Sequence, residues 1–357
     1  MRLKTAVGIG AGVTAGMATL AGVGAGLAAW KIYQRVRSGE GLAGKVVLIT
    51  GGSRGLGLAM AEEFAAQGAR LVICARDERE LETARSRIAA LGTEVLAVTC
   101  DVAVQDDVQS LVNHATARFG RIDVLVNNAG VIQVGPLESQ TLMDFQEAMD
   151  VMFWGTVYPT LAVLPQMRQR ASGHIANITS IGGKVSVPHL LPYGCAKFAA
   201  VGFSEGLRAE LARTGVNVTT VVPGLMRTGS HLNAYFKGKN QDEFTWFSLG
   251  ATLPVSAMSA RRAARRIVAA IRRGQAELIL TPQAKAVAFA HGIAPGATAD
   301  VLGLVNRLLP RGEGRGRERH LGRQSETSVT RSMLTVLGRK AARDLNQENA
   351  GVAQAKP

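Results

Sequence analysis

Cysteine is scarce in this sequence, which has three cysteines, Cys74, Cys100 and Cys195, among 357 residues. Their spacing matches none of the motifs by which cysteines bind structural metals, so we expect no metal site. Two of the three lie within apolar runs, and so small a number provides no disulfide framework. The sequence therefore favours a protein whose cysteines stay reduced, as they do on the cytosolic side of a membrane.

Aromatic residues are also few, at 5% of the chain, although the formal net charge is +14. A nucleic-acid interface typically combines a basic surface with aromatic side chains, and no basic region here has that character, so we expect no nucleic-acid partner. The positive charge is concentrated in residues 1–40, 261–273 and 310–357, whose net charges are +4, +6 and +5. Attraction to an anionic membrane surface explains this distribution at least as well.

A run of 25 residues without a charged side chain, Ala6–Trp30, is long enough to span a bilayer. Glycines recur in it at intervals of four residues, which permits close helix packing in membranes. The basic residues that follow Trp30 would stay on the cytoplasmic side. We therefore predict a single-pass transmembrane anchor with basic flanks at 1–37 and a main domain that faces the cytoplasm. A cleaved signal peptide or a peripheral helix is the alternative.

Apolar, β-branched runs alternate with helical patterns from residue 45 to residue 283, and short loops join them. Strict alternation of this kind predicts a parallel sheet with helices on both faces, the doubly wound Rossmann-like α/β fold. The seven predicted strands are 45–50, 70–74, 95–99, 122–126, 174–179, 216–222 and 277–281. The predicted helices are 58–67, 77–91, 104–119, 143–169, 193–213 and 261–272. One domain at 45–283 accommodates them all.

The C-terminal part of the chain has a weaker pattern. Residues 284–309 are mostly apolar, and we predict a helical segment that caps a site, contacts a membrane or packs on its own domain. Residues 311–323 have the composition of a linker, and residues 325–342 are predicted to form one helix. The whole stretch 310–357 is predicted to be a basic, partly disordered tail.

Two sets of residues carry the chemistry. The motif Thr50-Gly51-x-x-x-Gly55-x-Gly57 lies between a predicted strand and a predicted helix, where glycines let the backbone approach a pyrophosphate. Tyr193 and Lys197 are four residues apart and so share one helix face. An ammonium group beside a phenol is expected to lower the pKa of the phenol, which then exchanges a proton with an alcohol or a ketone. The hydroxyl of Ser180 is suited to hold the same substrate oxygen.

Together with Asn127-Asn128-Ala129-Gly130 after the fourth strand and Pro223-Gly224 after the sixth, these motifs resemble those of the short-chain dehydrogenases/reductases over residues 45–283. The resemblance implies an oxidoreductase that interconverts a carbonyl and an alcohol. It implies that Tyr193 is the catalytic acid/base, that Lys197 lowers its pKa and binds the nicotinamide ribose, and that Ser180 polarises the substrate carbonyl. The predicted cofactor-binding residues are Thr50, Gly51, Ser53, Arg54, Gly55, Leu56, Gly57, Arg76, Asp101, Val102, Asn127, Ala129, Gly130, Tyr193, Lys197, Pro223, Gly224 and Thr228.

The charge near the second strand predicts which cofactor binds. An acidic residue after that strand would bind a ribose 2′-hydroxyl and repel a 2′-phosphate. This chain instead has Arg76 there and Arg54 in the glycine turn. Two guanidinium groups would form a site for the 2′-phosphate, so we predict NADP(H) rather than NAD(H).

One position departs from the family pattern. The helix after Gly130 usually carries an asparagine that helps to arrange a proton relay to the lysine, and Met152 takes that place here. A thioether is a weak acceptor and has no proton to donate. The relay would therefore have to use the backbone, water or another side chain.

The segment between Leu225 and Met258 is the predicted substrate loop, and it is rich in apolar and aromatic residues. Such a loop suits a hydrophobic, lipid-like carbonyl or alcohol; packing against the domain is the alternative. We therefore expect a membrane-anchored NADP(H)-dependent oxidoreductase. A homodimer or a homotetramer is compatible with the sequence. A non-catalytic NADP(H)-binding sensor or membrane scaffold is the alternative, favoured by Met152 alone.

Overall fold

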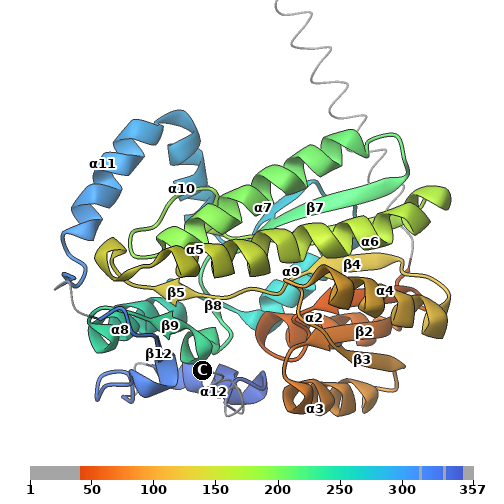
Figure 1. Ribbon diagram of the computed structural model, residues 1–357, viewed down its shortest axis with the longest axis horizontal. Coiled ribbons are helices and arrows are strands. Elements are labelled where there is room, and N and C mark those ends of the chain that lie inside the picture. Colours follow the sequence, from red (N-terminus) through yellow and green to blue (C-terminus); the bar gives the residue numbers. More distant parts are fainter. Residues whose placement is uncertain (1–40, 313–315, 333–334, 349–357) are drawn as a thin grey trace, which may run out of the picture.

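The structure, a computed structural model, describes residues 41–312, 316–332 and 335–348 (Figure 1). The predicted membrane anchor at 1–37 lies outside the described residues and stays a prediction. Within these three ranges, no helix combines the length and the apolar character that crossing a bilayer requires.

A seven-stranded sheet forms the centre of the described chain, in the order β3-β2-β1-β4-β6-β7-β11, and every neighbouring pair is parallel. Its strands are β1 (Val46–Thr50), β2 (Arg70–Ala75), β3 (Val95–Thr99), β4 (Val124–Asn127), β6 (Gly173–Ile178), β7 (Val216–Val222) and β11 (Glu277–Ile279). The seven predicted strands and the doubly wound fold are confirmed. The strand order reverses between β1 and β4, so the carboxyl ends of these two strands open a crevice.

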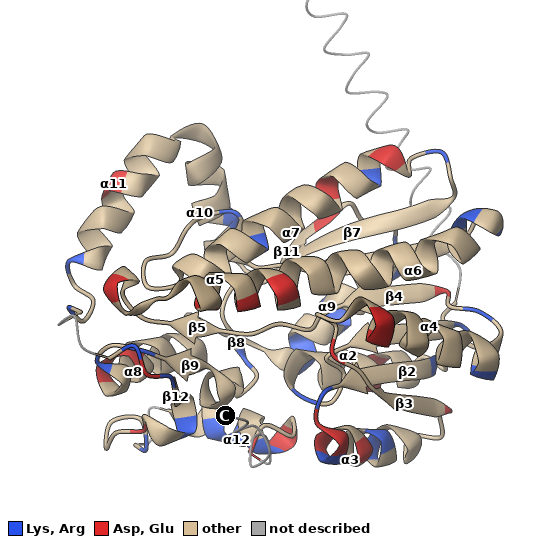
Figure 2. Ribbon diagram, viewed as in Figure 1, with Lys and Arg blue, Asp and Glu red and all other residues tan. Residues whose placement is uncertain are grey.

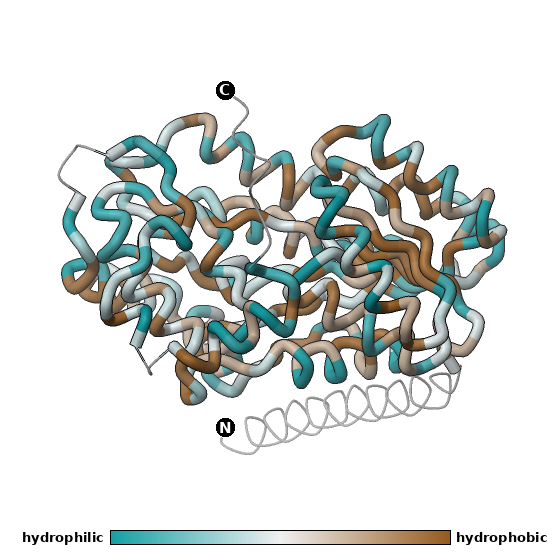
Figure 3. The backbone as a smooth tube through the Cα atoms, turned by 90° about the horizontal axis from the view of Figure 1, so that it is seen from below, coloured by the Kyte–Doolittle hydropathy of each residue, from teal (hydrophilic) through white to brown (hydrophobic). Residues whose placement is uncertain are grey.

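Helices cover both faces of the sheet because both faces of its strands are apolar. In β1, Val47 and Ile49 join one buried core, whereas Val46 and Leu48 join the other. The first core includes helices α2 (Gly55–Ala65), α3 (Glu78–Ala89) and α9 (Ala260–Arg272), and the second includes α4 (Gln105–Phe119), α6 (Gly155–Gln169) and α7 (Leu191–Glu210). Figure 3 shows the apolar strands side by side in the interior, between helices of mixed polarity.

The helix predicted at 143–169 is present but is divided into three parts. α5 (Leu142–Met149) passes into a π-helical turn, η2 (Asp150–Trp154), before α6 begins. Short elements on either side of this helix are β5 (Gln133–Val134), η1 (Leu137–Ser139) and η3 (Ile181–Gly183). The π turn lies beside the crevice, where it widens the helix.

The predicted substrate loop is a folded segment. It contains β8 (Met226–Arg227), η4 (Ser230–Asn233), β9 (Tyr235–Phe236), α8 (Asn240–Thr252) and β10 (Met258–Ser259). β10 pairs with β8, which brings the two ends of the segment together, and β9 pairs with β5, which ties the segment to the main domain.

The C-terminal segment is helical over most of 284–309, as predicted, and differs from its prediction further on. It contains α10 (Pro282–Ile293), α11 (Pro295–Asn306), β12 (His320–Leu321), η5 (Gly322–Gln324) and α12 (Val336–Asp344). The linker prediction for 311–323 is wrong, because β12 pairs with β9 in a small three-stranded sheet. The single helix predicted at 325–342 is also wrong, since α12 begins only at Val336. In both cases, contacts with distant parts of the chain outweigh the local composition.

Candidate active site

The glycine turn after β1 is held by close backbone packing. A Cβ atom at Gly57 would lie 2.0 Å from the carbonyl oxygen of Gly51, so only glycine fits there. Gly51 itself has a φ of +63°, in the left-handed region that favours glycine. The Thr50 hydroxyl accepts hydrogen bonds from the backbone N–H groups of Asn128 (2.9 Å) and Ala129 (3.1 Å), which fixes the end of β1 against the end of β4.

The start of α2 suits a pyrophosphate. Arg54 at its N-cap makes no side-chain capping hydrogen bond, so the first amides of the helix are not closed off by their own cap. One of them, the N–H of Gly55, donates to the carbonyl of Leu345 at 2.9 Å. A glycine turn that leads into an uncapped helix N-terminus fits the phosphates of a dinucleotide.

Three side chains meet at the carboxyl end of β6. Ser180 follows β6, and its hydroxyl oxygen accepts the N–H of Gly182 at 3.0 Å and shares a side-chain hydrogen bond with Tyr193. Tyr193 and Lys197 lie one turn apart on α7, as their spacing predicts. The ammonium of Lys197, whose side chain is buried, donates to the carbonyl of Ile178 at 2.9 Å and lies 5.9 Å from the centre of the Tyr193 ring. The arrangement can bind one carbonyl oxygen and supply it with a proton.

The protonation of this group differs from the sequence expectation. Burial raises the pKa of Tyr193, which the hydrogen bond from Ser180 only partly opposes. Burial also lowers the pKa of Lys197 to about 8. The expected lowering of the tyrosine pKa by its lysine neighbour is therefore wrong, because the main cause of both pKa shifts is the loss of water, which disfavours the charged form of each group.

Met152 takes the place expected from the sequence. Its thioether is buried against Gly130, where a Cβ atom would lie 3.6 Å from the sulfur and 3.9 Å from the ammonium of Lys197. The carbonyl of Met152 accepts the Thr156 hydroxyl at 2.9 Å, within the π turn η2. A methionine beside the lysine cannot donate a proton to a relay.

The glycine turn and the Ser180, Tyr193 and Lys197 group line one cleft of about 770 Å³, which lies at the carboxyl ends of the strands. Its lining includes the predicted residues Gly51, Ser53, Arg54, Gly55, Leu56, Arg76, Asp101, Val102, Ala129, Gly130, Ser180, Tyr193, Lys197, Pro223, Gly224 and Thr228. Thr50, Gly57 and Asn127 are absent from the lining. Asn127 lies beneath it, where its amide donates to the hydroxyl of Thr160 (3.0 Å) and the amide oxygen of Asn177 (2.9 Å).

Both arginines of the predicted 2′-phosphate site already face carboxylates. The guanidinium of Arg54 lies 3.0 Å from Glu80, and that of Arg76 lies 3.8 Å from Asp101. Glu80 also accepts the hydroxyl of Ser53 at 3.3 Å. Burial raises the pKa of Glu80, and the charge of Arg54 opposes that rise. Sequence reasoning missed Glu80, although its place in the first turn of α3, just after β2, directs it back towards the crevice.

The aromatic residues of the substrate segment divide into two groups. Phe236 and Phe244 are fully buried and form a separate apolar cluster, so packing within the segment explains them. Tyr235, Trp246 and Phe247 line the cleft. The indole N–H of Trp246 donates to the buried Glu243 at 2.7 Å, which fixes the ring at the cleft wall.

The C-terminal segment contributes residues that sequence reasoning missed. Four of them line the cleft, namely Arg319, Leu321, Gln324 and Gln347. The buried amide of Asn346 donates to the backbone carbonyls of Ser53 (3.1 Å) and Glu80 (3.2 Å). The end of the described chain is therefore a wall of the cleft beside Ser53 and Glu80, the end where the adenosine of a dinucleotide is expected.

A buried ion-pair network holds this segment in place. Asp144, at the start of α5, is 2.5 Å from the ammonium of Lys237 and 2.7 Å from the guanidinium of Arg319. Burial alone would raise the pKa of Asp144, but hydrogen bonds from Lys237, Thr141 and Arg319 hold it below its usual value. The Arg319 guanidinium also lies over the ring of Tyr235, with 5.4 Å between its carbon and the ring centre.

The parallel sheet, the glycine turn and the Ser180, Tyr193 and Lys197 group together define a dinucleotide-dependent oxidoreductase of the α/β class. Residues 45–236 match the model of the short chain dehydrogenase family. The chain belongs to that family.

Several known proteins share this similarity. A dehydrogenase/reductase SDR family protein 7-like from Drosophila melanogaster is 32% identical over 275 residues, which cover 74% of this chain and 82% of the relative. An 11-beta-hydroxysteroid dehydrogenase A from Sesamum indicum is 38% identical over 209 residues, 57% of this chain and 60% of the relative. The crystal structure of L-sorbose reductase from Gluconobacter frateurii complexed with NADPH and L-sorbose matches with a TM-score of 0.61 at 28% identity, covering 67% of this chain and 96% of that one.

Proposed function

We propose that this protein is a membrane-anchored, NADP(H)-dependent oxidoreductase that interconverts a carbonyl and an alcohol on a hydrophobic, lipid-like substrate. The observation that carries the proposal is the meeting of Ser180, Tyr193 and Lys197 in a cleft that also contains the glycine turn. A homodimer or a homotetramer is compatible with this activity.

The side chains divide the chemistry among them. When bound, the nicotinamide cofactor supplies the hydride for reduction or accepts it for oxidation. Ser180 donates a hydrogen bond to the substrate oxygen and so orients the carbonyl. Tyr193, whose raised pKa keeps its proton in place at neutral pH, transfers that proton to the oxygen. Lys197 holds the nicotinamide ribose.

Preference for NADP(H) rests on the two arginines at the adenosine end. Arg54 and Arg76 line the cleft there, and each is paired with a carboxylate that a 2′-phosphate would displace as its partner. Arginine binds phosphate through two parallel hydrogen bonds, which gives it an advantage over the single contact that each makes now. The NADPH complex of the related L-sorbose reductase supports the same choice.

A hydrophobic substrate is supported by the other end of the cleft. Tyr235, Trp246 and Phe247 form an aromatic wall there, next to Leu190 and Leu225. The name of the sesame relative, an 11-beta-hydroxysteroid dehydrogenase, supports a steroid-like compound. The uncharged run Ala6–Trp30 supports an anchor that brings the cleft to lipid-soluble compounds, with the domain facing the cytoplasm.

The test is NADPH oxidation with a panel of hydrophobic ketones and aldehydes, steroids included. We expect turnover by the wild type, a loss of between about 10²- and 10⁴-fold in kcat for Tyr193→Phe, and unchanged NADPH binding in that variant. Tyr158→Phe, on α6, serves as the matched control. Tight NADPH binding without turnover on any carbonyl would contradict the proposal and favour the sensor or scaffold that Met152 suggests.

A further inference from the structure

Helices α10 and α11 form an apolar hairpin that projects from one end of the molecule (Figure 1). Among their side chains only Ala284 is buried. Exposed apolar residues follow one another along the hairpin and just beyond it, and the most exposed are Phe289 (71%), Ile293 (67%) and, after the end of α11, Leu308 (86%). Four more large apolar side chains are exposed, namely Val287, Val301, Leu304 and Val305. A soluble domain rarely exposes so continuous an apolar surface unless something covers it.

The polarity of the hairpin is low on all its sides. Residues 282–309 contain three charged residues, Lys285, Asp300 and Arg307, and Figure 2 shows the two helices almost entirely in the neutral colour. Each helix has 12 residues and is therefore about 18 Å long. That length is well below the ~30 Å of a hydrocarbon core, so the hairpin suits insertion into one leaflet rather than a crossing.

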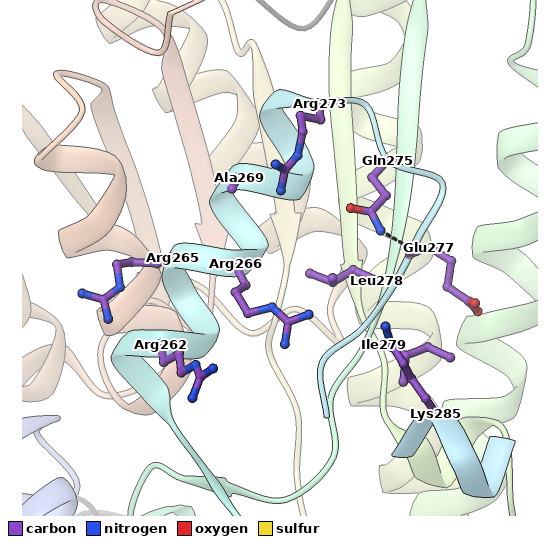
Figure 4. A pocket seen from close by; sticks show the side chains of 10 residues that line it. All are labelled: Arg262, Arg265, Arg266, Ala269, Arg273, Gln275, Glu277, Leu278, Ile279 and Lys285. Carbon is purple, nitrogen blue, oxygen red and sulfur yellow. Dashed lines mark hydrogen bonds between the residues drawn. The ribbon is translucent and has the colours of Figure 1, made fainter. Parts of the chain in front are cut away.

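A basic cavity lies at the base of the hairpin. It has a volume of about 580 Å³ and is lined by Lys285 of α10 and by four arginines along α9 and at its C-cap, Arg262, Arg265, Arg266 and Arg273 (Figure 4). The one carboxylate in the lining, Glu277, is already paired with Lys184 at 2.9 Å. The cavity therefore offers several positive charges to an anionic group next to an apolar surface.

The start of α10 contacts residues beside the cleft. The side chain of Gln283, at the start of α10, donates to the carbonyl of Val255 at 2.9 Å, and Val255 is 84% exposed. A Cβ atom at Gly224, which lines the cleft, would lie 3.5 Å from Ala284. The hairpin thus begins directly behind the wall of the cleft at Gly224.

We infer that α10 and α11 dock into an anionic lipid membrane, with the apolar hairpin in the outer part of one leaflet and the basic cavity on lipid headgroups. An apolar surface bordered by arginine and lysine is the pattern of an interfacial membrane contact. A protein partner is less well matched, because residues 282–309 contain only three charged side chains for specific pairing. This contact extends the proposed membrane location and places the cleft wall at Gly224 close to the membrane surface.

The test places an environment-sensitive fluorophore at residue 289. Phe289→Cys in the full chain with Cys195→Ser is labelled with a nitrobenzoxadiazole probe, since the other two cysteines, Cys74 and Cys100, are buried. The labelled chain is reconstituted into phosphatidylcholine vesicles containing phosphatidylserine and a lipid-borne nitroxide quencher. We expect at least roughly twofold quenching at 289. The matched control is Leu91→Cys, just after the C-terminal end of α3, where the side chain is 52% exposed and no quenching is expected.

Two quenching results would contradict the membrane contact. Equal quenching at the two positions overturns it, and so does a probe at 289 that is shielded from water but not quenched, which would mean that a second copy of the chain covers the hairpin. Quenching as strong in pure phosphatidylcholine as in anionic vesicles overturns the role of the basic cavity. That role also requires Arg262→Glu with Arg265→Glu to abolish the difference between the two vesicle types.

The membrane anchor and the enzymatic activity are measured separately on the same samples. If carbonate releases the chain and position 289 was quenched before release, the transmembrane anchor is ruled out and the hairpin contact is supported. If the chain stays with the membrane in carbonate but position 289 is not quenched, the anchor is supported and the hairpin contact is ruled out. Absence of turnover on every carbonyl would remove the proposed activity and leave the membrane contact standing.

Discussion

The two ends of the cleft hold their functional side chains in different ways. At the catalytic end, Tyr193 and Lys197 are positioned by one helix, and Lys197 is fixed by a backbone carbonyl, that of Ile178. At the adenosine end, Arg54 and Arg76 are fixed by the carboxylates of Glu80 and Asp101. One end therefore depends on buried side chains held by the backbone, and the other on partly exposed guanidinium groups, each paired with its own carboxylate.

Because of this difference, the two ends of the cleft should respond to different changes in solution. A buried ammonium without a carboxylate partner has a shifted pKa, so pH acts strongly at the catalytic end. A guanidinium that can exchange one anionic partner for another makes the adenosine end sensitive to which cofactor is present. The catalytic end should thus respond to protons and the adenosine end to phosphate.

The largest effect is expected from Lys197→Met, measured as the pH dependence of unfolding. The pKa of Lys197 is about 8 in the folded protein, below its usual 10.5. Between these values the unfolded chain holds a proton that the folded chain has released, so the wild type gains stability as the pH rises through that window. The gain relative to Lys197→Met is on the order of 3 kcal/mol by pH 10.5. Urea unfolding in mild detergent at pH 7 to 10.5 measures it.

Tyr193→Phe is the control for this comparison. It keeps Lys197, so it should keep the rise in stability above pH 8, even though it removes the catalytic proton. If the curves of the wild type and Lys197→Met run parallel from pH 7 to 10.5, burial does not govern the charge of this lysine and the contrast between the two ends fails.

The sequence predicted the parts of the site that local patterns determine. The β-branched run of β1 and the Thr50–Gly57 motif fix the turn within a few residues, and the helical spacing of Tyr193 and Lys197 fixes their common face. It could not predict the C-terminal wall of the cleft, because the hydrogen bond from Asn346 to Ser53 joins residues 293 positions apart. It predicted the sign of the Tyr193 pKa shift wrongly, because burial comes from the whole fold and not from the spacing.

The second effect concerns cofactor preference and uses Glu80→Gln. Glu80 places a buried carboxylate between Ser53 and Arg54, where a 2′-phosphate would bind. Removal of that charge frees Arg54 and ends the repulsion of the phosphate, so the Kd for NADPH should fall about tenfold, roughly 1.4 kcal/mol. The Kd for NADH should change little. Fluorescence titration with both nucleotides measures the ratio.

Glu78→Gln is the matched control, since Glu78 is exposed on the same helix turn. It should leave both dissociation constants unaltered. An equal change for NADPH and NADH in Glu80→Gln would mean that this end does not discriminate by phosphate, and the NADP(H) preference would have to rest on Arg76 alone.

The smallest effect is expected from Asn346→Gly, which tests whether the C-terminal wall belongs to the adenosine end. Asn346 has a φ of +57°, a conformation that glycine also adopts without strain, so the change removes the two hydrogen bonds to Ser53 and Glu80 and keeps the backbone. The loss of about 0.5 to 1.5 kcal/mol for a hydrogen bond loosens the turn that holds Arg54. We expect the Kd for NADPH to rise about threefold and kcat to stay unchanged.

The exposed Asn113→Gly on α4 controls for a general loss of stability, since it lies far from the cleft. A rise in Kd for Asn346→Gly alone would tie the last described residues to cofactor binding. A lower kcat at saturating NADPH would instead mean that the segment acts on the catalytic end through the shared cleft wall. The two ends would then be coupled, and the separation between proton response and phosphate response would not hold.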